Sequence, residues 1–389
     1  MRRGDRPEAH QPSSPRPHRE QRGRVLVPPH ADPAGRLIVE SLTLRDFRSY
    51  AAAEAELRPG LVLIVGENGS GKTSVLEAIH VATQGFSPRA RADRYLVRQG
   101  QHQARVRVRA REGAALSEVE ALVRRDGGKE LRLNGRPVES IERVRADLPV
   151  LVFTPDRLAL VKAGPVVRRA YLDRVLARLQ PTAASLPREY AFALAQRNAA
   201  LRRAAAGLSG RDAIAPWSRS LANLGSRLVA ARRRVVEELA PLFSSYAEAL
   251  GVGDARLSYQ GDAPTLGDLE SRLGTDLDRG VTTVGPHLHD LGLARGQRDL
   301  RMLGSQGEQR LAVLALLLAE REALARARGL FPPLLLDDVL SELDAPRRRA
   351  LIALLPASGQ TLVTSADRQA LPADPAQTLV AGRGQLREA

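Results

Sequence analysis

Cysteine is absent from the 389 residues of this chain, and several other residue types are scarce. Without cysteine the chain forms neither disulfides nor thiolate metal sites, which fits a reducing, cytoplasmic location. Aromatic residues make up only 3% of the chain, so base stacking is not expected to be its main means of recognition. No apolar run approaches the roughly 20 residues that span a bilayer, and the N-terminus has no apolar signal core. We therefore expect a protein that is neither secreted nor embedded in a membrane.

Lysine is scarce as well, because only Lys72, Lys129 and Lys162 occur among the 59 basic residues. The net charge of +15 favours a polyanionic partner such as DNA, held through a salt-sensitive contact with its backbone. An arginine-rich coding bias on solvated surfaces would give the same charge. A lysine retained at position 72 against this bias indicates that a compact ammonium is needed there.

A phosphate-binding pattern lies in the stretch 62–79, which reads VLIVGENGSGKTSVLEAI. An apolar strand, a glycine-rich turn and a helix start follow one another, as the pattern G-x-x-x-x-G-K-S/T requires. Glycines let backbone amides curl around an anion, and the helix N-terminus adds free donors. An ordinary glycine-rich strand–helix turn is the alternative. The predicted ATP-binding residues are Gly66, Glu67, Asn68, Gly69, Ser70, Gly71, Lys72 and Thr73.

A second apolar strand, at 333–336, ends in Asp337 and Asp338. A carboxylate at the C-terminal edge of the sheet beside a phosphate loop is what Mg²⁺ binding requires. We expect Thr73 and Asp337 to hold Mg²⁺, and Asp338 to orient or deprotonate the attacking water. Lys72 and Asp338 are therefore the predicted catalytic residues. Taken without the loop, the same acidic pair could end any core strand.

The turn at 305–307 precedes an apolar helix and offers a second N-terminal anion site. Because the chain already has its own phosphate loop, a second site suggests a head-to-tail pair of subunits that share nucleotides. An ordinary serine cap before a core helix is the alternative.

Composition and periodicity divide the chain into four parts. Residues 1–35 predict a disordered basic extension, and 36–160 a first half of an ATPase head with β hairpins. Helices are expected within 161–280, the last of them from 213 to about 240, where Pro241 should break or kink it. Residues 281–389 should form the second half of the head. The basic residues that we expect to contact DNA are Arg168, Arg169, Arg202, Arg203, Arg232, Arg233 and Arg234.

These motifs together resemble the ABC-type ATPases of chromosome maintenance, and among them the RecF family. The resemblance spans about residues 36–385 and rests on stretches that recur in register. These stretches read LRDFRSY, GENGSGKT, LVRQG, FTPDRLALVKAGPVVRRAYLD, TTVGPH, SQGEQR and LLLDDVLSELD.

The resemblance implies an α/β fold in which an ABC-type ATPase head carries an inserted α-helical arm. The head would combine a mixed sheet bearing the phosphate loop with an antiparallel β subdomain. It also implies a weak, DNA-stimulated ATPase that uses ATP and Mg²⁺ and dimerises with ATP at junctions of single- and double-stranded DNA. RecO, RecR and RecA would be its partners in gap repair. The turn would contact ATP held by the other subunit through Ser305, Gln306, Gly307, Glu308 and Gln309.

Two departures from the family pattern bear on these expectations. Leu288 and His289 stand where a basic and an acidic residue are expected, and Glu308 stands where glutamine is more usual. A carboxylate near a γ-phosphate is unfavourable unless it faces away. Two other functions share the phosphate loop, namely the ATPase subunit of a membrane transporter and a small-molecule phosphotransferase. A transporter ATPase would usually carry a switch histidine after the last strand, where this chain has Thr364 and Ser365.

Overall fold

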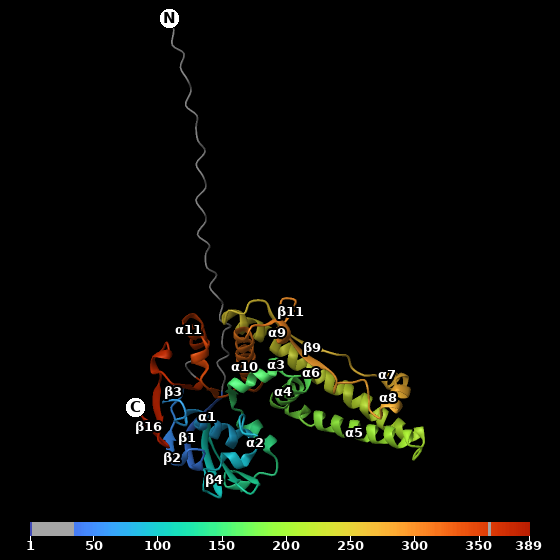
Figure 1. Ribbon diagram of the computed structural model, residues 1–389, viewed down its shortest axis with the longest axis horizontal. Helices are drawn as coiled ribbons and strands as arrows, with labels where there is room; N and C mark the ends of the chain where they lie inside the picture. The colour runs from blue at the N-terminus through green and yellow to red at the C-terminus, as the bar shows by residue number, and fades with distance from the viewer. Residues whose placement is uncertain (2–34, 357–358) are drawn as a thin grey trace.

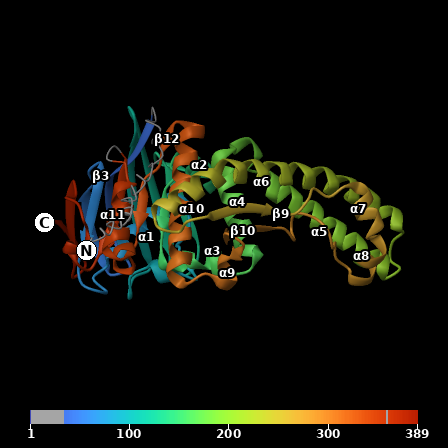
Figure 2. The same ribbon diagram turned by 90° about the horizontal axis from the view of Figure 1, so that it is seen from above.

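The computed structural model describes Met1 and residues 35–356 and 359–389, so the basic extension expected at 1–35 lies outside the described segments apart from its two ends. A head made of sheets and helices carries an elongated arm of helices (Figures 1 and 2). The α/β architecture with an inserted helical arm agrees with the expected fold class.

The central sheet of the head carries the phosphate loop. Its strands run parallel except for the last, β16, which pairs antiparallel with β15. The strands β8, β13 and β14 are buried on both faces, as is usual for parallel sheets. In spatial order they are β8 (Leu151–Phe153), β13 (Leu334–Leu336), β14 (Gln360–Ser365), β3 (Gly60–Val65), β15 (Gln377–Gly382) and β16 (Gln385–Glu388).

A second, mostly antiparallel sheet packs beside it. Along β4, apolar residues such as Val106 and Val108 point inward, while the arginines between them pair with glutamates of β5. Asn134 and Gly135, between β6 and β7, both have positive φ, at 51° and 77°, as a type I′ hairpin turn requires. The strands are β1 (Gly35–Phe47), β2 (Tyr50–Glu56), β4 (Gln103–Glu112), β5 (Ala115–Arg124), β6 (Lys129–Leu133), β7 (Arg136–Pro137) and β12 (Leu330–Phe331).

The central sheet separates two apolar cores. Val62 and Ile64 of β3 pack with α1 and the antiparallel sheet, while Leu63 and Leu336 pack with α10, α4 and α6. Both faces of the strand that leads into the phosphate loop are therefore fixed. The head helices are α1 (Lys72–Gln84), α2 (Ile141–Asp147), α3 (Ala159–Lys162), α9 (Leu300–Leu303), α10 (Gln306–Arg328) and α11 (Ala345–Ala353).

The arm consists of long helices packed side by side and capped by a short helical pair (Figure 2). Strand β9, which lies before the predicted boundary at 280, pairs with β10 after it, so the two segments form one sheet. The elements are α4 (Pro165–Leu179), α5 (Leu186–Ala205), α6 (Ala215–Ala249), α7 (Leu266–Ser271), α8 (Leu273–Arg279), β9 (Ala255–Gln260), β10 (Asp290–Arg295) and β11 (Arg298–Asp299).

The expectation that the long arm helix would stop near residue 240 is wrong, because α6 continues through Pro241 to Ala249. Proline removes one backbone hydrogen bond, to the carbonyl four residues earlier. Pro241 and Glu237 both lie on the exposed face of α6, where water can take up the freed carbonyl. On the buried face Leu239, Leu242 and Phe243 continue the apolar stripe and hold the helix together.

Candidate nucleotide site

The phosphate loop connects β3 to α1 in the predicted order. Gly69 and Gly71 have φ of 81° and 104°, conformations that side chains rarely adopt. A Cβ added to Gly71 would lie 2.8 Å from the Tyr50 hydroxyl, so Gly71 also leaves no room for a side chain. No side chain caps the N-terminus of α1. This helix end is therefore open to an anion.

Lys72 is buried and folds back over the loop. Its Nζ donates hydrogen bonds to the carbonyl oxygens of Gly66 and Glu67, at 2.6 and 2.8 Å. These contacts hold the ammonium at the mouth of the loop and stabilise its charge at a site that excludes most water. A bound phosphate would meet a cation that is already in position.

Asp337 meets Thr73 although 264 positions separate them in the chain. Strand β14 lies between β13 and β3 and brings both ends to one edge of the sheet. Thr73 and Thr364 donate their hydroxyl hydrogens to Asp337 Oδ1, at 2.8 and 2.9 Å. Burial raises the pKa of Asp337 above its ordinary value, against the opposing effect of these two hydrogen bonds.

These groups fit Mg²⁺, which prefers carboxylate and hydroxyl oxygens. Thr73 and Asp337 would hold the ion, and it would supply a positive charge against the phosphate oxygens. The buried carboxylate has no basic partner among the ion pairs of the described residues. A cation at this position would compensate its charge.

Asp338 adopts a left-handed conformation, with φ of 49°. Its backbone N–H donates to the Thr364 hydroxyl at 2.8 Å. This geometry is uncommon for a residue other than glycine and turns Asp338 out of line with the strand. Asp338 lines a cavity of about 490 Å³ together with Lys72 and Thr73.

Three residues of this site escaped the sequence reasoning. Arg48 and Arg89 line the same cavity, and Arg48 is held by Glu77 through bonds of 2.8 and 2.6 Å. Thr364 bonds both Asp337 and Asp338, as described above. Arg48 lies in the quoted stretch LRDFRSY and Arg89 in the arginine-rich stretch after α1. Only the pairing of the strands reveals that these side chains converge.

The turn at 305–307 begins α10 and is not among the residues that line the phosphate-loop cavity of its own chain. Ser305 caps the helix by accepting from the Glu308 amide, while Glu308 Oε2 accepts from the Ser305 amide at 2.8 Å. Arg295 pairs with the other Glu308 oxygen. These hydrogen bonds lower the pKa of Glu308. The carboxylate therefore turns back onto its own chain, while Ser305, Gln306 and Gly307 stay exposed.

Gln309 differs from its neighbours in the turn. Its side chain is 4% exposed, and its amide nitrogen donates to the Leu300 carbonyl at 2.8 Å. In this conformation Gln309 supports the turn from inside, and it does not present its side chain to a second subunit.

The predicted DNA contacts divide into two groups. Arg168 and Arg232 are buried and form ion pairs with Asp290 and Asp173, so the prediction that they contact DNA is wrong for this conformation. Buried guanidinium groups need such partners, and these two connect α4 to β10 and α6 to α4. Arg169 is half-buried and donates to the His289 carbonyl. The exposed members of the set are Arg202, Arg203, Arg233 and Arg234.

The departures at 288 and 289 have different surroundings. Leu288 is exposed, whereas the His289 ring lies 2.8 Å from the Tyr259 hydroxyl. Burial lowers the pKa of His289 to about 4, so at neutral pH its ring carries no charge.

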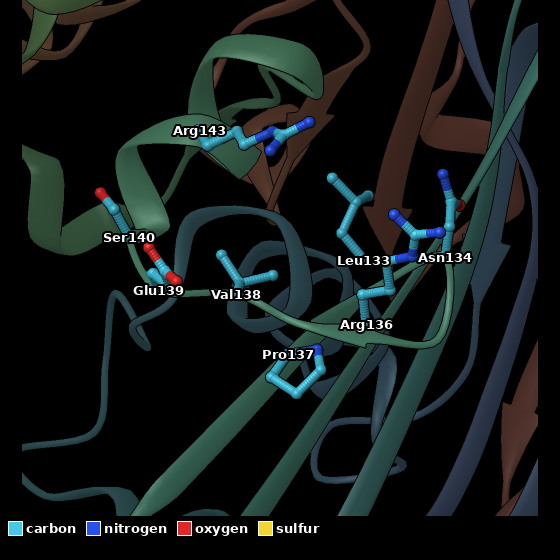
Figure 3. A pocket seen from close by; sticks show the side chains of 8 residues that line it. All are labelled: Leu133, Asn134, Arg136, Pro137, Val138, Glu139, Ser140 and Arg143. Carbon is cyan, nitrogen blue, oxygen red and sulfur yellow. The ribbon is translucent and has the colours of Figure 1, made fainter.

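Another cavity, of about 580 Å³, lies between the β6–β7 hairpin and the start of α2, and Figure 3 shows the side chains that line it. Its polar residues, including Arg136 and Arg143, are exposed to solvent. It therefore lacks the buried polar groups of the phosphate-loop cavity. Among the described residues, no group of acidic, histidine or cysteine side chains could hold a metal ion by itself, and no helix could cross a membrane.

The sequence of this chain is similar to those of a known family. The model of the RecF/RecN/SMC N-terminal domain matches residues 38–381. The DNA replication and repair protein RecF of Acidothermus cellulolyticus is 37% identical over 356 residues, which cover 86% of this chain and 96% of that protein. RecF of Anaeromyxobacter dehalogenans is 39% identical over 349 residues, which cover 85% and 92%.

Solved structures agree with the sequences. A structure described as the recombination mediator protein RecF with ATP, in the RecFOR pathway, superposes with a TM-score of 0.81. It shares 26% identity, over 91% of this chain and 98% of that one. The Smc head domain of Pyrococcus furiosus superposes with a TM-score of 0.56 at 18% identity, which reflects the shared fold.

Proposed function

This chain belongs to the RecF family of DNA replication and repair proteins, and we propose that ATP closes two copies of it on DNA during gap repair. In this proposal the closed dimer binds junctions of single- and double-stranded DNA in the cytoplasm. It acts with RecO and RecR to help load RecA. DNA stimulates a slow hydrolysis of ATP, which reopens the dimer and so limits how long it stays on DNA.

The proposal rests on two separate groups of residues that could contact ATP, one at the phosphate loop and one at the turn that begins α10. Lys72, Thr73, Asp337 and Asp338 converge on one edge of the head. The exposed turn that begins α10 is not part of the described lining of that cavity, and its carboxylate pairs with Arg295 of the same chain. A second copy could bring this turn to the nucleotide, where its exposed hydroxyl and amides would meet the γ-phosphate. The dimer would then depend on the terminal phosphate of ATP.

The residues of each half have distinct tasks in this scheme. Lys72 binds the β- and γ-phosphates, and Thr73 and Asp337 hold Mg²⁺, which offsets the negative charge of the phosphate oxygens. Asp338 orients the attacking water or accepts its proton. Because the side chain of aspartate is one methylene shorter than that of glutamate, we expect a loose hold on this water. Slow hydrolysis suits a switch that times the closed state.

Light scattering can test ATP-dependent closure directly. The Asp338→Asn variant should bind Mg-ATP and hydrolyse it slowly, so its solution mass should double with Mg-ATP and stay that of a monomer with Mg-ADP. A variant that turned over ATP like the wild type would remove Asp338 from the mechanism. A monomer with both nucleotides would show that ATP alone does not close the dimer.

A substitution at Gly307 can test the role of the turn without disturbing the fold. A Cβ at this position would meet no atom closer than 3.9 Å, and φ is not positive, so Gly307→Arg should fold normally. Combined with Asp338→Asn, it should leave ATP affinity unchanged and abolish the doubling of mass, because the side chain blocks the approach of a second loop. Undiminished doubling would exclude the turn from the interface.

A further inference from the structure

A second cationic cavity, of about 160 Å³, lies beside α1, the helix that follows the phosphate loop. It is lined by residues of α1, of α4 and of the segment that follows β8. Its polar lining comes from His80, Thr154, Asp156, Arg157, Tyr171, Arg174 and Arg178.

The charges around this cavity do not balance. Arg178 pairs with the fully buried Glu320, which also accepts from the Tyr171 hydroxyl. The guanidinium groups of Arg157 and Arg174 have no hydrogen bond or ion pair with any residue that the structure describes. Burial lowers the pKa of Arg157 to about 10, so it remains charged at neutral pH. Besides the paired Arg178 and Glu320, the cavity is lined by two arginines, Arg157 and Arg174, and one carboxylate, Asp156, so one positive charge remains in excess.

The uncharged polar groups of the lining include the Thr154 hydroxyl and the His80 ring. Thr154 is 3% exposed, and its hydroxyl has no partner in the described chain. An unsatisfied buried hydroxyl is costly, whereas Arg157 and Arg174 are half-buried and their guanidinium groups keep contact with solvent. Nδ1 of His80 lies 2.9 Å from the Phe86 carbonyl oxygen, which only accepts, so Nδ1 carries the hydrogen. Burial lowers the pKa of His80 to about 3, so the imidazole is neutral at pH 7 and adds no positive charge to the cavity.

We propose that this cavity binds a small tetrahedral oxyanion of the phosphate class through Arg157, Arg174 and the Thr154 hydroxyl. Its volume of about 160 Å³ leaves room for a single phosphate group. Arginine forks and a hydroxyl supply the donors that a tetrahedral oxyanion accepts.

The position of the cavity links it to the ATP site. Asp156 lines this cavity and also an adjoining one that contains Arg48, Ser74 and Arg89. Those three residues also line the phosphate-loop cavity. The turn that joins Thr154 to Arg157 therefore separates the two anion sites, so inorganic phosphate released by hydrolysis would have a second site close by. A terminal phosphate of DNA has the same chemistry.

Calorimetry on the full chain tests this site, provided that the phosphate loop is filled first. A non-hydrolysable ATP analogue with Mg²⁺ is first titrated to saturation, which measures binding at the phosphate loop by itself. Inorganic phosphate is then titrated into the saturated protein. We expect a further equivalent of phosphate to bind. Arg157→Gln and Arg174→Gln should each weaken that binding by on the order of tenfold or more, because each removes charge-assisted hydrogen bonds. The exposed Arg219→Gln is the control and should bind like the wild type.

Thr154→Val keeps both arginines and the shape of the cavity, so we expect this variant to fold. A change in its phosphate binding can then be attributed to the lost hydroxyl. The substitution should weaken phosphate binding severalfold, and phosphate should raise the melting temperature of the wild type more than that of the variants. Absence of binding to the wild type, or equal binding to all variants, would overturn the proposal. Displacement of phosphate by a 5′-phosphorylated oligonucleotide, but not by its unphosphorylated form, would assign the site to a DNA end; otherwise free phosphate is the ligand.

Discussion

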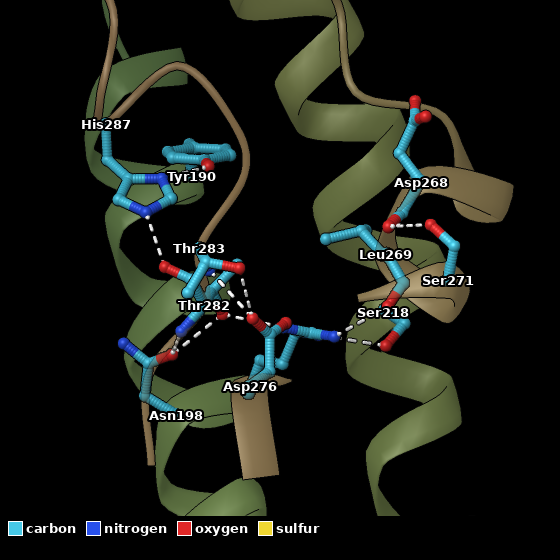
Figure 4. A network of polar contacts seen from close by, with 11 residues as sticks. Tyr190, Asn198, Ser218, Asp268, Leu269, Ser271, Asp276, Thr282, Thr283 and His287 are labelled. Carbon is cyan, nitrogen blue, oxygen red and sulfur yellow. Dashed lines mark hydrogen bonds and ion pairs between the residues drawn. The ribbon is translucent and has the colours of Figure 1, made fainter. Parts of the chain in front are cut away.

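Two buried aspartates, one in the arm and one in the head, have opposite surroundings. Asp276 in the arm is fully buried and pairs with the equally buried Arg197 at 2.7 Å (Figure 4). Its other oxygen accepts from the amide and the hydroxyl of Thr283, at 2.9 and 2.6 Å. Asp337 in the head is 5% exposed, and its acceptor contacts come from the hydroxyls of Thr73 and Thr364.

The difference distinguishes a structural ion pair from a site that is ready for a ligand. Arg197 compensates the charge of Asp276 and reaches Ser218, Thr282 and the Leu269 carbonyl as well, so this network fixes the end of the arm. No basic side chain of the described residues pairs with Asp337, and burial raises its pKa. A buried carboxylate left in this condition lowers stability until a cation binds. Within one chain, burial of an acid is thus no guide to its role unless its partners are known.

Breaking the arm network should have the largest effect. Asp276→Asn preserves the shape of the side chain but leaves Arg197 buried without a counter-charge. We expect the free energy of unfolding to fall by about 3–5 kcal/mol, measured by urea denaturation. A loss below about 1 kcal/mol would mean that water reaches Arg197 and that the network contributes little. ATP affinity at the head should not change while the protein is folded.

Removing the cation of the phosphate loop should have the next largest effect. Lys72→Ala should weaken ATP binding by on the order of 10- to 100-fold, because it removes a charge-assisted contact with phosphate. Binding of a fluorescent ATP analogue provides the measurement. Lys162→Ala, at an exposed lysine that ends α3, is the matched control and should bind normally. If both variants bound ATP like the wild type, the predicted role of Lys72 would be wrong.

Asp337→Asn should change stability in the opposite direction from Asp276→Asn. We expect Asp337→Asn to stabilise the protein in the absence of Mg²⁺. Asparagine still accepts hydrogen bonds from Thr73 and Thr364 but carries no charge to bury. We expect the free energy of unfolding of the variant at pH 7 to exceed that of the wild type by about 1 kcal/mol. The pKa of Asp337 is raised in the folded state, so its protonated form is favoured there. The wild type should therefore lose stability relative to the variant as the pH rises from about 4, the unfolded pKa.

Thermal unfolding with and without Mg-ATP completes this test. The wild type should gain stability from Mg-ATP, whereas Asp337→Asn should gain much less, because its cation site has lost the carboxylate. Destabilisation of the variant at pH 7 without Mg²⁺ would show instead that the Asp337 carboxylate is already compensated.

The contrast between the two aspartates also explains what could be read from the sequence. The phosphate loop and the acidic pair at 337 and 338 were predictable, because each depends on a contiguous motif with a fixed physical purpose. Thr364 was not given a role, because its contact with Asp337 depends on the order of β13, β14 and β3 in the sheet. Arg168 and Arg232 were assigned to the surface because their partners, Asp290 and Asp173, lie 122 and 59 positions away. Sequence gives the charge of a residue but not its partner.

The smallest effect is expected from exposed arginines in the arm, where a paired and an unpaired charge can be compared directly. Arg233 and Arg234 are neighbours on the exposed side of α6, but Arg233 pairs with Asp262 at 2.6 Å, and Arg234 has no partner among the described residues. If the arm contacts DNA, Arg234→Ala should weaken binding a few-fold at any sequence and reduce the slope of log affinity against log salt by about 1. Arg233→Ala should change the slope less, because Asp262 already neutralises that charge. Equal salt slopes for both variants and the wild type would place the DNA contact outside this part of the arm.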